Sequence, residues 1–439
     1  MGGLGTGPLG TMPLGGGTPE LPTFVNAPVS EVKTRAYIKR RLGSTGLFES
    51  SWYEITDYIQ RFGGVSREID IVRRNRFLNS GVTLTGRNDE GKFNDEENPN
   101  SFWFGYLTRF NTLLKVELAY LDSTGADVLS DSSLGIFILD QEIPISGDRN
   151  TISLRGSSLR SIFDAEKATA VNGLAGTHTA SEVIALIRDH TDGAGTPLFR
   201  QFITSTAWTI QTTTTNYILA TATTLDGLSC WDLMEKLAEA ENRVVLINRT
   251  GGVEFRTRDA RTSAVAFAFR GQGFVNPNVI ALTEYKEPWD RFFTGVRIKF
   301  GEADTSTSYV NAGTTTVVSP SNLRWKYGQR VLEFENRFIP NTATAQALAD
   351  SILTDSSDLK REVTIKSLAV PTLEDLDRIS VSYRSYDIVG QTLWEHFSWD
   401  GANWAGEGET FDWETKEFVV ASIRVNADDY TMEVKAREA

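Results

Sequence analysis

The sequence predicts an α+β protein that is mainly β, with several β-barrel or sandwich domains, a few short helices and an extended N-terminal arm. Most of the chain consists of short β-prone runs separated by turn residues. Apolar residues follow helical spacing at only three places, and the first 27 residues show neither pattern. Because 439 residues are too many for one ordinary core, we expect more than one domain.

The arm comprises residues 1–27, in which glycine and proline separate isolated apolar side chains. Glycine has the largest backbone entropy and proline removes hydrogen-bond donors, so neither a helix nor a central strand is expected there. A free tail of this composition would be disordered. We therefore predict that a partner chain holds the arm. The predicted contacts are Leu4, Leu9, Met12, Leu14, Leu21 and Phe24.

Residues 28–158 are predicted to form a first β-barrel domain. Runs of β-branched and aliphatic residues alternate here with turn signals, which is typical of a barrel or a sandwich. The expected strands lie at residues 36–38, 69–72, 82–84, 115–118 and 135–139. We therefore expect this domain to be a β unit.

Residues 159–225 are predicted to form a small mixed α/β module. Val183, Ile184 and Ile187 fall on one face of a helix expected at residues 180–189. The threonine-rich segment 209–225 favours exposed strands. The module therefore combines one helix with short strands.

Residues 226–330 are predicted to form a middle α/β domain with a long polar loop near residues 301–322. Ser229 is placed to cap a helix that runs to about residue 241. Its buried stripe is expected to contain Trp231, Met234, Leu237 and Ala238. Strands at 244–247 and 253–256 follow, joined by a turn, with another strand at 297–300. Segment 301–322 is a long loop or an extended hairpin, and long loops are usually functional or bound to a partner.

Residues 331–439 are predicted to form a C-terminal helix plus β-barrel domain that carries a Trp-rich hairpin. The helix is expected at residues 342–353, with Asn341 at its cap. Strands are expected at 363–368, 378–383, 418–425 and 431–436. The hairpin spans residues 393–413, turns at Asp400-Gly401 and carries Trp394, Trp399, Trp404 and Trp413. These rings either pack against this chain or a neighbouring subunit, or stack on a glycan.

The sequence predicts no catalytic, cofactor-binding or metal-ligating residues and no bound cofactor. His178, His190 and His396 lack zinc-site spacing, and Cys230 is predicted to be a packed thiol on its helix. The GxGxxG match at residues 5–10 has no strand before it and no helix after it, so it is no dinucleotide site.

Paired carboxylates keep a glycosidase or peptidoglycan lyase open as an alternative. The pairs are Asp89 with Glu90, Glu96 with Glu97, and Glu407 with Glu409. Residues 88–93 superficially suggest a calcium loop, but the position of its first carboxylate ligand holds Gly86. A turn between strands is predicted there instead.

Composition excludes several classes of function. A formal charge of −13 repels nucleic acid on average, so no specific DNA binding is predicted. No run approaches the roughly 18 consecutive apolar residues of a membrane-spanning helix, so no membrane insertion is expected. A single cysteine precludes an intrachain disulfide, and with no signal-peptide pattern this predicts synthesis in a reducing cytoplasm.

The order of elements resembles tail hub and tail tip (baseplate hub) proteins of long-tailed bacteriophages and related phage-like tails. Residues 52–159 look like their opening domain, through segments 52–59, 82–84, 88–93 and 135–137. The helix and hairpin at 228–255 are similar to their middle domain. Segments 345–353, 371–379 and 430–434 are similar to their C-terminal end, although this chain has Leu376-Asp377 where the family usually has a glycine before the aspartate.

This resemblance implies a homo-oligomeric ring, commonly a trimer, between the tail tube and the tip fibre or spike. Its partners would be the neighbouring tail tube, distal tail and tip or fibre proteins. DNA would pass transiently through a negatively charged lumen without specific binding. The resemblance therefore implies a non-enzymatic virion protein of the tail tip or baseplate that aids DNA ejection and host entry. The alternative is a virion-associated glycan-binding adhesin or cell-wall hydrolase.

Overall fold

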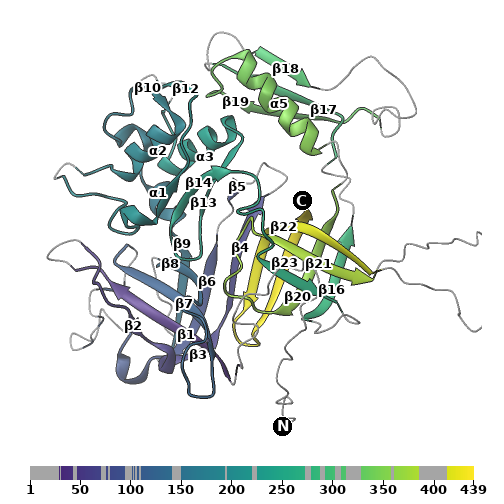
Figure 1. Ribbon diagram of the computed structural model, residues 1–439. Helices are drawn as coiled ribbons and strands as arrows, with labels where there is room; N and C mark the ends of the chain where they lie inside the picture. The colour runs from purple at the N-terminus through teal and green to yellow at the C-terminus, as the bar shows by residue number, and fades with distance from the viewer. Residues whose placement is uncertain are drawn as a thin grey trace, which may run out of the picture.

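The computed structural model is a mainly β molecule in which a large sheet carries smaller α/β units (Figure 1). It describes residues 29, 31–42, 47–70, 76–77, 80–93, 101, 103, 106–107, 110–140, 150–192, 195–219, 225–271, 278–286, 292–301, 308–312, 328–356, 360–384 and 413–439. The predicted arm and most of the predicted Trp-rich hairpin lie outside these residues. The α+β, mainly β fold class is confirmed.

The N-terminal half of the large sheet is antiparallel, in the order β4-β6-β9-β8-β7-β1-β2. Short β3 pairs with β6, and β5 with β4. Alternate side chains of these strands are buried, as in β6, where Val82 and Leu84 face the core. The strands are β1 (Glu31–Arg40), β2 (Tyr53–Glu54), β3 (Ile59–Phe62), β4 (Gly64–Asp70), β5 (Arg76–Phe77), β6 (Gly81–Arg87), β7 (Thr112–Leu121), β8 (Ser133–Leu139) and β9 (Thr151–Ser158).

The C-terminal half of the sheet contains strands from two separate parts of the chain, residues 267–286 and 362–438. Its order is β16-β20-β23-β22, with β21 on the other side of β22 and β15 parallel to β21. The strands are β15 (Phe267–Arg270), β16 (Val279–Lys286), β20 (Glu362–Leu368), β21 (Arg378–Arg384), β22 (Trp413–Asn426) and β23 (Thr431–Glu438). Residues of the predicted middle domain thus supply two strands to the sheet that holds the C-terminal strands.

Strand β22 joins the two halves into one sheet. Its first seven residues pair with β21, whereas its last five pair with β4, with Val425 opposite Val65. Strand β4 therefore pairs with β22 and not with β2, and the described strands close no barrel. Of the two predicted alternatives, the described strands form sandwich-like sheets. Both halves contribute to a shared apolar core.

The middle of the chain forms a helical layer beside this sheet. Strands β11 (Trp208–Ile210), β13 (Arg243–Ile247) and β14 (Val253–Thr257) form a small sheet, and β10 (Gly176–Thr179) pairs with β12 (Asn216–Leu219). The helices here are α1 (Arg160–Ala165), α2 (Ala180–Arg188) and α3 (Cys230–Ala240). Short 3-10 turns lie at Thr56–Tyr58, Asp89–Gly91, Ala168–Ala170 and Ser205–Ala207.

Helix α3 begins as the sequence predicts. Ser229 Oγ accepts the backbone N–H of Asp232 at 3.1 Å, and the Asp232 carboxylate accepts the backbone N–H of Ser229. This reciprocal capping satisfies two N–H groups at the helix start. Thr179 and Glu182 make the same arrangement at the start of α2.

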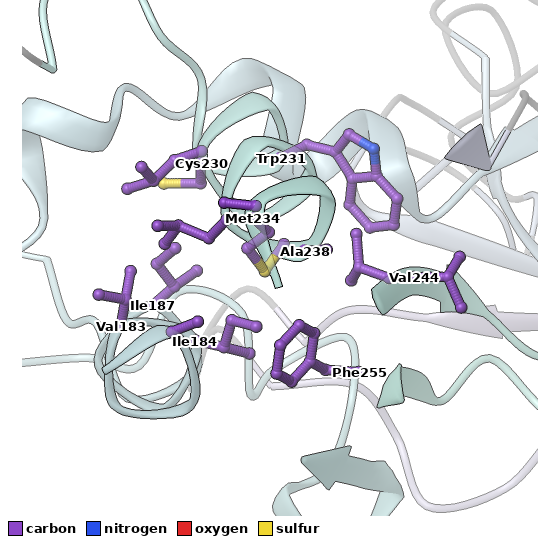
Figure 2. Close-up of a cluster of buried hydrophobic side chains, with 14 of the residues drawn as sticks. Val183, Ile184, Ile187, Cys230, Trp231, Met234, Ala238, Val244 and Phe255 are labelled. Carbon is purple, nitrogen blue, oxygen red and sulfur yellow. The ribbon is translucent and has the colours of Figure 1, made fainter. Parts of the chain in front are cut away.

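An apolar cluster fills the space between α2, α3 and the small sheet; we call it the helical core. Figure 2 draws its labelled members, which are Val183, Ile184, Ile187, Cys230, Trp231, Met234, Ala238, Val244 and Phe255. All of the predicted α2 and α3 core residues belong to it, including Leu237. The spacing of apolar residues therefore identified these helix faces correctly.

A further α/β unit contains β17 (Gly295–Phe300), β18 (Ser308–Ala312), β19 (Val331–Asn336) and α5 (Thr342–Ser356). Strand β18 runs antiparallel to β17 and lies within the segment predicted to be a long loop or an extended hairpin. The Asn341 carboxamide accepts the backbone N–H of Thr344 at 2.9 Å, as expected for the predicted cap. Figure 1 shows α5 lying across this three-stranded sheet.

Several described elements were not expected from the sequence. They include helix α1 and strands β2, β3, β5, β9, β15, β16 and β19. All the predicted strands named above have counterparts in the described structure, which confirms them. The turn at Leu376 keeps the left-handed conformation that glycine favours, with φ of 65°. The domain boundaries stay a prediction.

Candidate functional site

The predicted contact residues lie largely outside the described structure. All six arm residues fall there, as do Trp394, Trp399 and Trp404. Trp413 is the first residue of β22, where its backbone pairs opposite Arg384. Their roles in contacts therefore stay predictions.

The residues weighed for chemistry are scattered in the fold. Asp89 starts the 3-10 turn after β6, which confirms a turn at this place. Cys230 is a buried free thiol, and burial, followed by the charge of Glu166, raises its pKa to about 12. This confirms the predicted packed thiol, since a thiol with a raised pKa is a poor nucleophile.

The histidines do not form a metal site in the described structure. His190 is buried, with its Nε2 3.9 Å from a Glu166 carboxylate oxygen, and His178 lies on β10. Within the described ranges, no group of three or more His, Cys, Asp and Glu is placed to hold a metal ion. His396, Glu96, Glu97, Glu407 and Glu409 lie outside those ranges.

The most elaborate polar arrangement is a largely buried cluster of ion pairs where the helical layer meets the two halves of the large sheet. We call it the charged junction. Its members are Arg67 of β4, Arg249 in the turn between β13 and β14, Glu254 of β14, Arg261 just beyond β14, and Glu374, Asp375 and Asp377 in the turn before β21. Each layer therefore supplies charged groups to the same interior.

Arg261 is the centre of the charged junction. Its Nη1 lies 2.6 Å from Glu254 Oε1, and its Nη2 lies 2.9 Å from Glu374 Oε2. Its Nε donates to the Asp375 carbonyl at 2.8 Å. Burial lowers the pKa of Arg261, but the surrounding carboxylates outweigh it and the net shift is upward. The guanidinium thus stays charged and ties β14 to the turn before β21.

Arg249 extends the charged junction to the N-terminal half of the sheet. Its Nε lies 3.0 Å from Glu374 Oε1, and its Nη1 lies 3.0 Å from an Asp131 carboxylate oxygen. Glu374 therefore bridges two arginines. The Ser133 hydroxyl, at the start of β8, also donates to the Arg249 carbonyl at 3.2 Å.

Arg67 connects strand β4 to the charged junction. It is only 5% exposed, and its Nη2 donates to the Leu373 carbonyl at 2.8 Å. This contact joins β4 to the turn that carries Glu374, Asp375 and Asp377. The turn before β21 is therefore contacted by Arg67, Arg249 and Arg261.

Two carboxyls of the charged junction have unusual acidity. Burial raises the pKa of both Asp375 and Asp377 to about 6, with nearby Arg67 and Arg261 opposing the shift. Asp375 is 2% exposed, and its Oδ1 has no hydrogen-bond partner among the described protein groups. The Asp377 carboxylate accepts the backbone N–H of Glu374 at 2.7 Å, which closes the turn.

The charged junction links the helical layer to both halves of the large sheet. Buried ion pairs contribute little net stability because both charges lose water. No sequence pattern predicted these seven residues as a site. A signal was present in Glu374-Asp375-Leu376-Asp377, an acidic run that follows an apolar residue and directly precedes a strand.

The described helices include none long and apolar enough to cross a membrane. No family model matches the sequence. No curated protein matches it either.

Solved structures share the fold. A tail protein from Neisseria meningitidis MC58 superposes with a TM-score of 0.50 at 11% identity, over 92% of this chain and 96% of that one. The 43 kDa tail protein of prophage MuSo2 from Shewanella oneidensis gives a TM-score of 0.50 at 12% identity, over 92% and 98% of the two chains. At such low identity the likeness establishes the fold alone, and it extends over nearly the whole length of all three chains.

Proposed function

We propose that this protein is a structural subunit of a phage-like tail, acting as a tail hub or baseplate component. The observation that carries the proposal is the fold that it shares with two tail proteins over 92% of its length. The shared region includes the large sheet, the helical layer and the α5 unit together. A likeness over all layers supports a common architectural role more strongly than a likeness in one domain.

The construction of the interior supports a mechanical role. A subunit of a tail must keep its shape while force and DNA pass through the assembly. Strand β22 makes one sheet of two halves, and the charged junction fixes the helical layer against both. These devices resist sliding between layers, because any shift would separate buried opposite charges.

We propose further that the subunit forms a homo-oligomeric ring, with a trimer as the expected state, between the tail tube and the tip fibre or spike. The formal charge of −13 suits a lumen through which DNA passes without adhering. Neighbouring tube, distal tail and tip or fibre proteins would contact its two faces. This role needs shape and symmetry and no catalytic centre.

In this proposal the N-terminal arm clasps a neighbouring protein through Leu4, Leu9, Met12, Leu14, Leu21 and Phe24. The Trp-rich hairpin, with Trp394, Trp399, Trp404 and Trp413, supplies a second contact between subunits. Large aromatic rings give much contact area for little conformational entropy. The protein would then reside in the virion at the tail tip or baseplate.

The proposal is tested by mass photometry of the purified chain with and without residues 1–27, together with negative-stain imaging of particles that carry each version. A matched variant replaces the six apolar arm residues by serine and keeps the arm length. We expect rings from the full chain, and failure to enter tails from both altered chains. The hub role would be overturned if the chain were a stable monomer and particles assembled without it.

A further inference from the structure

The outer edge of the C-terminal half of the sheet carries exposed apolar side chains. Strand β16 forms this edge, and β20 is its only partner among the described strands (Figure 1). Ile280 and Leu282 of β16 are 47% and 39% exposed, and Leu368 at the end of β20 is 61% exposed. We call these three residues the apolar rim. They are three of the five exposed large hydrophobic side chains in the described part of the chain, so apolar exposure is concentrated here.

The backbone of β16 is irregular along this edge. Its pairing with β20 shifts register between Val279 and Ala281 and again between Leu282 and Glu284. Such bulges bend and twist an edge strand, which makes it a poor partner for the edge of another folded sheet. An extended, adaptable segment can follow an irregular edge and cover its side chains. The apolar rim therefore suits a flexible segment of chain better than a second sheet.

The first residues of β1 lie close to the apolar rim. Val32 of β1 pairs with Tyr120 of β7, and the Tyr120 hydroxyl donates to the carbonyl of Ala369, the residue after Leu368. Val32, Tyr120 and Val279 at the start of β16 also pack against the same apolar core. The N-terminal arm, which precedes β1 in the chain, therefore joins the fold near the rim.

The arm has the composition and the reach to cover the rim. Leu21 and Phe24 are its predicted contact residues nearest to β1, and Glu20 is its only charged side chain. Seven residue steps lead from Phe24 to Glu31, and an extended chain of that length spans about 23 Å. One strand spacing of about 5 Å and the length of one tyrosine side chain separate β1 from the residue after β20. Phe24 can therefore reach the apolar rim of its own chain.

We propose that the arm docks on the apolar rim of its own chain, with Leu21 and Phe24 covering the three exposed side chains. The contact removes apolar surface from water, and the nearly uncharged arm brings almost no charge that must lose its hydration. The inference does not depend on the proposed tail role. It narrows the contact of the arm with a neighbour to the four predicted contact residues before Leu21, because the two nearest β1 are held by their own chain.

Cysteine protection tests this contact. Ile280→Cys places a reactive thiol on the apolar rim, and the natural Cys230 is buried at 0% exposure and does not compete. The rate of alkylation by N-ethylmaleimide is measured in the full chain and in the chain without residues 1–27. We expect the full chain to react about tenfold more slowly, because the docked arm excludes the reagent. Ile218→Cys, at an isoleucine of β12 that is 68% exposed, is the matched control and should react equally in both chains.

Substitutions within an arm of full length locate the contact. Serine at both Leu21 and Phe24 should abolish the protection of Ile280→Cys, whereas serine at the four predicted contact residues before Leu21 should preserve it. Circular dichroism checks that each variant is folded. Equal alkylation rates with and without residues 1–27 would overturn the inference.

The dependence on protein concentration identifies the chain that supplies the arm. Docking within one chain gives the same protection at every concentration. Protection that appears only as the concentration rises would assign the rim to the arm of a second copy and overturn the inference. Mass photometry of the same samples separates this inference from the tail role, because rings without protection would contradict only the docking, and protection without rings would contradict only the ring.

Discussion

Two neighbouring residues of β14 face opposite kinds of interior. Phe255 points into the helical core, whereas Glu254 points into the charged junction, because successive side chains of a strand alternate between its faces. Both are buried, with exposed fractions of 0% and 7%. One side of the strand is held by non-directional packing and the other by directed ion pairs. The comparison teaches that equal burial can imply very different tolerance to substitution.

The strongest test of this comparison is a conservative substitution on each side of β14. Glu254→Gln should lower the free energy of unfolding by about 3–5 kcal/mol, because it leaves the buried Arg261 without one of its partners. Phe255→Leu should lower it by about 1–1.5 kcal/mol, because the core keeps an apolar side chain. Urea denaturation of both variants measures the two losses. A loss for Glu254→Gln no greater than that for Phe255→Leu would show that the charged junction packs like an ordinary core.

The helical core was predictable from sequence for a local reason. Ser229, its cap, and the apolar stripe of α3 lie within one short segment, so spacing alone specifies the helix and its buried face. Helix α1 has only six residues, too few for a periodic pattern to appear. Local information therefore found the long helices and missed the short one.

The charged junction and the pairing of β15 with β21 were not predictable because the partners are distant in sequence. Arg261 meets the Asp375 carbonyl across 114 positions, and β15 pairs with β21 across a similar separation. No sequence pattern states which acidic run a given arginine will meet. Leu376 differs from these distant contacts because it concerns a local turn. Its backbone keeps the left-handed conformation without glycine, and its side chain is buried at 2% exposure.

The second test uses pH, to which only the charged side of the comparison should respond. The folded-state pKa of Asp375 and of Asp377 is raised to about 6, above the ordinary 3.8. The folded state therefore binds more protons between these values, and the stability from these groups is greatest below about pH 4 and is lost as pH rises to about 6. Each group accounts for a loss on the order of 2–3 kcal/mol.

Asp375→Asn isolates this contribution from carboxylates whose effect on stability has the opposite pH dependence. One such group is Asp355, where burial raises the pKa but Arg437 and other cations lower it overall. The difference in unfolding free energy between the variant and the unaltered chain should shift in favour of the variant as pH rises from 4 to 7. Thermal and urea unfolding at several pH values measure it. A pH-independent difference would mean that Asp375 titrates normally.

The third test concerns the helix that builds the apolar side. Ser229→Ala removes the Oγ acceptor at the start of α3 and should lower the free energy of unfolding by about 1 kcal/mol. Ser229→Thr keeps a hydroxyl that can accept this N–H and donate to the Asp232 carboxylate, and should have a much smaller effect. Urea denaturation compares the two, and equal losses would indicate that the side chain at this position acts through packing rather than capping.

The smallest expected effect comes from an ion pair at the surface, which separates the role of charge from the role of burial. Arg297 and Glu333 lie opposite each other on β17 and β19, 2.6 Å apart, with side chains 43% and 62% exposed. Water already solvates both groups, so their coupling in a double-mutant cycle to alanine should be about 0.2–1 kcal/mol.

The same cycle on Arg261 and Glu254 has the same pair chemistry and the same 2.6 Å separation, but both side chains there are at most 15% exposed. Its coupling energy should be several times larger and much less sensitive to added salt, because screening acts weakly on buried charges. Equal couplings in the two cycles would mean that the charged junction is solvated in solution, and that its arginines do not fix the three layers.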